Sequence, residues 1–72
     1  MGFSKYLEEK GFKYHESTDS YRRSKGFGRF ITVEKVFLTL FTVKNENTII
    51  HDDFIDNFNQ FKEIITKALK DE

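Results

Sequence analysis

The most apolar part of the chain runs from Arg29 to Val43 and is rich in β-branched and aromatic residues. It contains no glycine or proline, as is typical of β-strands. A strand with one solvent-facing side alternates apolar and polar residues, whereas the positions between Val36 and Phe41 make both sides apolar. Both faces of this segment therefore need cover, and we expect the rest of the chain to fold around it.

The register of this segment has two alternatives. Fifteen strand residues without a break would be unusually long, so we favour a sharp bend, with a two-residue turn at Glu34-Lys35 as its simplest form. Neither residue favours the positive φ that such a turn needs. In a single strand, Phe37 and Phe41 lie on the face opposite Val36. With the turn, one face carries Ile31, Val33, Val36, Leu38 and Leu40. The other face then carries Phe30, Thr32, Phe37, Thr39 and Phe41.

A long amphipathic helix is predicted near the C-terminal end of the sequence. It begins at a cap formed by Asp52 or Asp53 and ends at about Leu69, with acidic residues at its start and lysines at its end, as the helix dipole favours. Its apolar stripe has spacings of three and four residues and consists of Phe54, Ile55, Phe58, Phe61, Ile64, Ile65, Ala68 and Leu69.

A second, shorter helix is predicted from Ser4 to Lys10. Ser4 can cap its start, and Gly11 can end it in the left-handed conformation. Because about two helical turns are not stable alone in water, we expect this helix to dock on the rest of the domain.

Shorter extended segments lie on either side of the central one. Residues 12–16 alternate like a strand, residues 17–20 have the composition of a turn, and residues 21–25 form a basic strand or extended loop. Glycines interrupt the pattern at 26–28, and residues 48–50 add a short extended segment.

These elements predict an α+β fold in one domain spanning residues 1–72. We expect a short N-terminal helix, a meander of three to four antiparallel strands and a long C-terminal amphipathic helix packed on one face of the sheet, in α-β-β-β-α order. Which face the long helix covers is open at this point.

The aromatic content predicts an interaction surface. Nine Phe and three Tyr in 72 residues are more large rings than a domain of this size readily buries. Helices on one face of the sheet leave the other face free to contact a partner. We therefore expect a non-catalytic protein-interaction module, most simply a homodimer, whose contact face carries Phe30, Phe37, Thr39 and Phe41.

The charge distribution offers an alternative function. The net charge is zero, but residues 1–44 contain nine Lys and Arg against five Asp and Glu, and residues 45–72 contain three against seven. Cations beside aromatic rings can neutralise phosphates and stack on bases. The alternative is therefore a nucleic-acid-binding module that uses Tyr21, Arg22, Arg23, Lys25, Phe27 and Arg29.

Residues 25–33, Lys-Gly-Phe-Gly-Arg-Phe-Ile-Thr-Val, resemble the aromatic signature of RNA-recognition and cold-shock domains. That signature places alternate rings on one sheet face. Here Arg29 stands between Gly28 and Phe30, so an unbroken strand sends Phe30 to the face opposite Phe27. The order helix, three strands, helix is similar to the double-stranded-RNA-binding fold, but the last helix starts with acidic residues where that fold presents lysines. We assign the chain to none of these families.

Catalysis, metal binding and membrane insertion are not expected. No cysteine is present, and His51-Asp52-Asp53 is better explained as a helix start than as a metal site, because adjacent residues do not converge on one ion. No nucleophile motif or phosphate-binding glycine loop occurs, so we expect no enzyme activity, cofactor or small-molecule substrate. No apolar run is long enough to cross a bilayer, and a cysteine-free sequence fits the cytoplasm.

Overall fold

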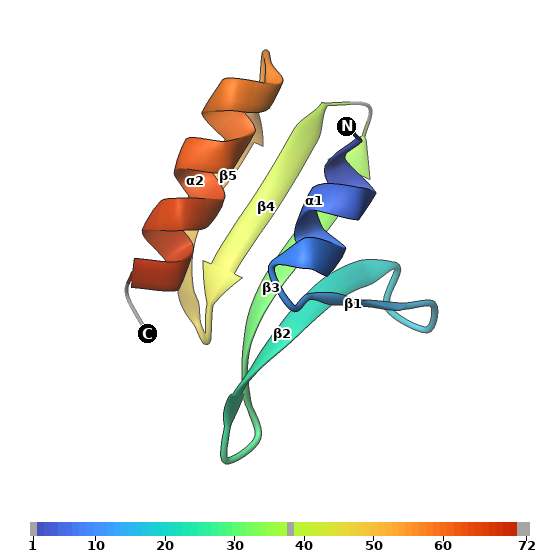
Figure 1. Cartoon of the computed structure of the whole chain (residues 1–72), viewed down its shortest axis with the longest axis vertical. Coiled ribbons are helices and arrows are strands. Elements are labelled where there is room, and N and C mark those ends of the chain that lie inside the picture. The colour runs from blue at the N-terminus through green and yellow to red at the C-terminus, as the bar shows by residue number, and fades with distance from the viewer. Residues whose placement is uncertain (1, 38, 71–72) are drawn as a thin grey trace.

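The computed structural model describes residues 2–37 and 39–70, which form one antiparallel sheet with a helix at each end of the chain (Figure 1). The strands follow one another as a meander, so that each pairs with its sequence neighbours. In chain order the elements are α1 (Phe3–Glu9), β1 (Lys13–His15), β2 (Ser20–Gly26), β3 (Arg29–Phe37), β4 (Leu40–Asn45), β5 (Thr48–Phe54) and α2 (Phe58–Lys70).

The α+β class, the two terminal helices and the antiparallel meander confirm the sequence prediction. The expected number of strands, three to four, is wrong, because the sheet has five. The additional strand comes from the segment after residue 47, which was expected to be extended only over residues 48–50. It continues as β5 to Phe54, where its backbone pairs with Leu40 of β4.

The predicted turn at Glu34-Lys35 is also wrong. Both residues lie inside β3, where they pair with Thr42 and Phe41 of β4, and the chain reverses between Phe37 and Leu40. Leu38, which was assigned to a sheet face, lies outside the described residues. A two-residue turn instead joins β2 to β3. There Phe27 and Gly28 have φ angles of 56° and 74°, as a primed hairpin turn requires.

The long helix starts later than predicted. It begins at Phe58, and its cap is Asn57 instead of Asp52 or Asp53. The Asn57 Oδ1 accepts a hydrogen bond from the Gln60 backbone N–H at 2.8 Å, and the Gln60 Oε1 accepts one from the Asp56 N–H at 2.9 Å. This reciprocal pair is close to a capping box. Residues 52–54, which were placed in the helix, belong to β5.

The short helix is present over Phe3–Glu9, although Ser4 does not cap it. The N-cap is Gly2, which makes no side-chain hydrogen bond, and the Ser4 hydroxyl instead accepts a hydrogen bond from the Tyr21 hydroxyl of β2 at 2.6 Å. Gly11 follows the helix with a φ of 90°, in agreement with the predicted stop. The helix therefore docks on the sheet, as its length demands.

Both helices lie on the same face of the sheet (Figure 1). Between them, the Phe3 ring of α1 contacts Phe41 of β4 at a centroid distance of 5.4 Å and Phe61 of α2 at 4.5 Å. One hydrophobic core fills this layer and consists of Tyr6, Leu7, Phe12, Ile31, Val33, Phe41, Val43, Ile55, Phe61, Ile65 and Ala68. Because Ile31, Val33, Phe41 and Val43 point into it, the alternate residues of β3 and β4 point to the other face.

Candidate interaction surface

Three large apolar side chains form a row on the sheet face that neither helix covers. The register pairs Phe37 with Leu40 and Leu40 with Phe54, so these residues are neighbours across β3, β4 and β5. Phe37 is 63% exposed and Phe54 is 52% exposed. Paired Cβ atoms in an antiparallel sheet are about 4.5–5.5 Å apart, which makes the row a continuous apolar patch. We call Phe37, Leu40 and Phe54 the apolar row.

Two rows of polar residues follow on the same face. The next one holds acidic side chains on β3 and β5, and the Thr42 hydroxyl between them donates a hydrogen bond to the Asp52 Oδ1 at 3.1 Å. This acidic row consists of Glu34, Thr42 and Asp52, in register with His15 and Ser20. The row after it carries cations on three strands. This basic row consists of Lys13, Arg22, Thr32 and Lys44, and its position on β5 is held by Ile49, which is apolar and 55% exposed.

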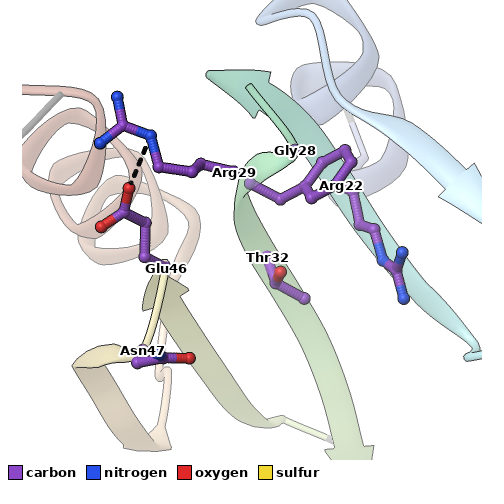
Figure 2. Close-up of a pocket in the computed structure, with 7 residues that line it drawn as sticks. Arg22, Gly28, Arg29, Thr32, Glu46 and Asn47 are labelled. Carbon is purple, nitrogen blue, oxygen red and sulfur yellow. Dashed lines mark ion pairs between the residues drawn. The ribbon is translucent and has the colours of Figure 1, made fainter. Parts of the chain in front are cut away.

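The far end of the face is aromatic and basic. The Arg22 guanidinium lies over the Phe30 ring at 5.7 Å from its centroid, a cation–π contact. Beside them is a shallow hollow of about 510 Å³, formed where β2, β3 and the β4–β5 turn meet (Figure 2). It is lined by Arg22, Gly28, Arg29, Phe30, Thr32, Glu46 and Asn47.

The residues predicted for the interaction face do not all share one face. Phe30 and Phe37 lie on the uncovered face, at its opposite ends, and Thr39 is exposed in the β3–β4 turn. Phe41 lies on the helix-covered face, is 3% exposed and contacts Phe61 at 5.5 Å. A one-residue shift in the register between Lys35 and Phe37 causes this difference, because it turns Phe37 away from the core.

The residues predicted to bind nucleic acid are also divided between surfaces. Strand alternation puts Arg22 on the uncovered face, whereas Tyr21, Arg23 and Lys25 point to the helix side, and Tyr21 packs against the core. Phe27 is at the tip of the β2–β3 turn, where it is 96% exposed. Strand geometry therefore leaves no single patch that contains all six residues.

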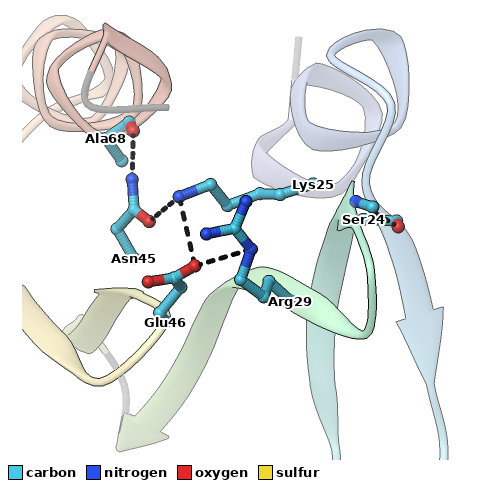
Figure 3. A network of polar contacts seen from close by, with 7 residues as sticks. Ser24, Lys25, Arg29, Asn45, Glu46 and Ala68 are labelled. Atoms are coloured by element: carbon cyan, nitrogen blue, oxygen red, sulfur yellow. Dashed lines mark hydrogen bonds and ion pairs between the residues drawn. The ribbon is translucent and has the colours of Figure 1, made fainter.

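Two of those cations are engaged in a polar network beside α2 (Figure 3). The Lys25 Nζ donates a hydrogen bond to the Asn45 Oδ1 at 2.6 Å and lies 3.8 Å from the Glu46 carboxylate. The Asn45 Nδ2 donates to the Ala68 carbonyl at 3.1 Å, and the Arg29 Nε pairs with Glu46 at 3.1 Å. This network joins β2, β4 and the last turn of α2, so we assign Lys25 and Arg29 a structural role.

The described residues hold few features of a reactive site. They contain no group of three His, Cys, Asp or Glu side chains that converge on a metal. The Tyr14 hydroxyl donates a hydrogen bond to the Asp19 carboxylate, and this bond, with the negative charge of Asp19, raises the pKa of Tyr14 above its ordinary value of 10.0. This tyrosine is exposed beside a turn, a position that suits a structural contact. None of the described helices is long and apolar enough to cross a membrane.

Sequence reasoning missed two of the three members of the apolar row. Phe54 was assigned to the long helix because it continues the three- and four-residue spacing of the Phe58 stripe. The Asn57-x-x-Gln60 pair, which starts immediately before Phe58, is the signal that could have moved the helix start to Phe58. Leu40 was placed with the aliphatic core residues because the turn position was wrong.

Comparison of the chain with family models, curated proteins and solved structures finds no match. The function is therefore inferred from the geometry of the uncovered face.

Proposed function

We propose that this chain is a small non-catalytic protein-interaction module that self-associates through the uncovered sheet face, with the apolar row in the contact. The observation that carries the proposal is the alignment of Phe37, Leu40 and Phe54 on three neighbouring strands, with both phenylalanines more than half exposed. Contiguous exposed apolar patches on soluble domains mark interaction sites. The proposed setting is the cytoplasm, as expected from a cysteine-free sequence.

The dimensions of the face suit such a contact. A protein interface of ordinary size buries about 800 Å² on each partner. The two longer dimensions of the molecule, 33 and 25 Å, lie along the plane of the sheet, so a face-to-face contact has the required extent.

The test is the oligomeric state of single-residue variants, measured by light scattering and sedimentation. We expect the unaltered chain to dimerise, and Phe37→Ser and Phe54→Ser each to shift it to a monomer that keeps the circular dichroism of the folded chain. Phe27→Ser is the matched control, because it removes an even more exposed ring at the β2–β3 turn, away from the apolar row. A chain that stays monomeric at millimolar concentration, or a dimer that both variants leave intact, contradicts the proposal.

A second candidate function is single-stranded nucleic-acid binding at the aromatic-basic end of the face. The hollow beside Arg22 and Phe30 supports it, because it places a guanidinium and an aromatic ring at one concave surface. We expect micromolar affinity that falls steeply with salt and falls again in Arg22→Ala. Arg23→Ala is the comparison within the same strand, because Arg23 points to the helix side. Fluorescence anisotropy with labelled single-stranded RNA and DNA at low salt tests this, and no binding of either excludes it.

A further inference from the structure

We propose that the partner of this surface is a second copy of the chain in an antiparallel orientation. In this dimer, β3 of one copy lies over β3 of the other and runs in the opposite direction. The acidic row of each copy then lies on the basic row of the other, and the apolar row of each lies on the Phe30 end of the other. This inference depends on the proposed self-association and adds its orientation.

The order of the rows along the strands carries the argument. Along β3 the uncovered face reads Phe30, Thr32, Glu34 and Phe37. Because successive rows are two or three residues apart along β3, neighbouring rows are separated by about 7–10 Å. This spacing is even enough for a row of one copy to lie over a different row of the other copy. The face therefore consists of an aromatic end, a basic row, an acidic row and an apolar end, in that order.

Symmetry then leaves two simple ways to stack the face on itself. The two-fold axis of a face-to-face dimer lies in the plane between the sheets, and it can run along the strands or across them. If it runs along the strands, each row meets its own copy, so Glu34 faces Glu34 and Arg22 comes near Lys44. If it runs across the strands near residue 33, the acidic row of each copy meets the basic row of the other.

The second arrangement, which we call the crossed dimer, is therefore favoured electrostatically, because like charges opposed across an interface repel each other. In it, Glu34 lies above Thr32 of the second copy, and the register flanks that threonine with Arg22 and Lys44. The same operation brings Phe37 over Phe30 of the second copy, whose ring already holds the Arg22 guanidinium. Phe37, in the apolar row of one copy, thus lies against Phe30 at the opposite end of the face of the other copy.

A distance between spin labels tests the orientation directly. The chain has no cysteine, so Phe27→Cys creates a unique and fully accessible labelling position at the β2–β3 turn. In the crossed dimer the axis passes near residue 33, and the two labels lie at opposite ends, on the order of 40 Å apart at about 3.3 Å per residue. In the other arrangement both turns lie at the same end, separated mainly by the roughly 10 Å between stacked sheets.

Charge reversal gives an independent measurement. We expect Glu34→Arg to weaken dimerisation about tenfold or more, because the new cation faces Arg22 and Lys44, and the triple variant Glu34→Arg, Arg22→Glu, Lys44→Glu to recover it. Glu63→Arg makes the same change of net charge on the exposed side of α2 and should leave the dimer unaltered.

The outcomes separate the two proposals. A long label distance with a dissociating Glu34→Arg supports the crossed dimer. A short distance, or a dimer that Glu34→Arg leaves intact, overturns this inference while the proposed self-association stands. A labelled chain that is monomeric overturns both.

Discussion

Asn45 shows how one buried polar residue fixes the arrangement of the two layers. It lies at the end of β4 on the helix side, where its amide group bonds Lys25 through the oxygen and the Ala68 carbonyl through the nitrogen. A buried amide is tolerated when its donors and acceptors are satisfied, and is costly when they are not. The last turn of α2 is therefore held at one position along the sheet, a position that apolar contacts alone would specify less strictly.

Tyr14 gives a pH prediction at the same scale. The hydrogen bond to Asp19 favours the neutral phenol, so the pKa of Tyr14 is higher in the folded chain than in the unfolded chain. The stability from this bond is therefore fully present below pH about 10 and is lost as the pH rises through the folded pKa. We expect Asp19→Asn, which suits the positive φ of 49° at this position, to return the pKa of Tyr14 toward its ordinary value.

Tyrosine-resolved NMR titration of the two chains measures this difference. Tyr21 is a useful internal reference, because its hydroxyl bonds Ser4 and not a carboxylate. An unchanged pKa of Tyr14 in Asp19→Asn contradicts the assigned cause.

At the scale of elements, the sequence was sufficient for element type and insufficient for boundaries. The two terminal helices follow from periodicity and the antiparallel meander from the short connections between strands, and both are correct, whereas the expected number of strands is not. The start of α2 was misplaced because Phe54 and Ile55 continue a helical spacing by chance, while the backbone of Phe54 pairs with Leu40. Such pairing is a contact between distant residues, which local spacing does not encode.

The faces of the central strands were harder to predict than their existence. Alternation from Ile31 and Val33 would put Phe37 on the core side, but the shift after Lys35 reverses it. A bulge of one residue leaves no clear trace in composition. The candidate surface therefore depended on a register that the sequence alone could not specify.

Asn57 provides the prediction for α2. Its side chain satisfies the Gln60 N–H, which otherwise has no partner in the first turn of the helix. We expect Asn57→Ala to lower the free energy of unfolding by about 1 kcal/mol, the usual cost of a lost N-cap. Urea denaturation followed by circular dichroism measures it. Asn59→Ala is the control, because this exposed residue lies inside the helix, where alanine is favourable; equal losses in both variants would contradict the capping role.

At the scale of the whole molecule, charge is organised by sheet rows and not by the two halves of the sequence. The acidic row joins Glu34 from the basic half to Asp52 from the acidic half. The zero net charge therefore conceals a face with adjacent bands of opposite sign. When one copy is turned by the two-fold rotation proposed above, its acidic row faces the basic row of the other copy. A uniformly basic surface, which suits a polyanion, does not have this property.

Because the chain is small, the proposed self-association should have a measurable effect on its unfolding temperature. A chain of 72 residues buries a modest fraction of its surface, so a contact that adds buried area adds substantially to its stability. If unfolding is coupled to dissociation, the unfolding temperature rises with protein concentration. A hundredfold increase corresponds to about 2.7 kcal/mol for each dimer, or about half of that for each chain. For a domain of this size, that predicts a rise of roughly 5–10 °C.

Two phenylalanine variants separate the contribution of the interface from that of the core in the same thermal experiment. Phe37→Ser should abolish the concentration dependence and leave the unfolding temperature near that of the dilute unaltered chain. Phe41→Ser should instead lower stability by about 3–5 kcal/mol at every concentration, because it leaves a polar cavity between Phe3 and Phe61. If Phe37→Ser destabilises the dilute chain as strongly as Phe41→Ser does, Phe37 belongs to the core of the monomer, and the apolar row is not a surface available for association.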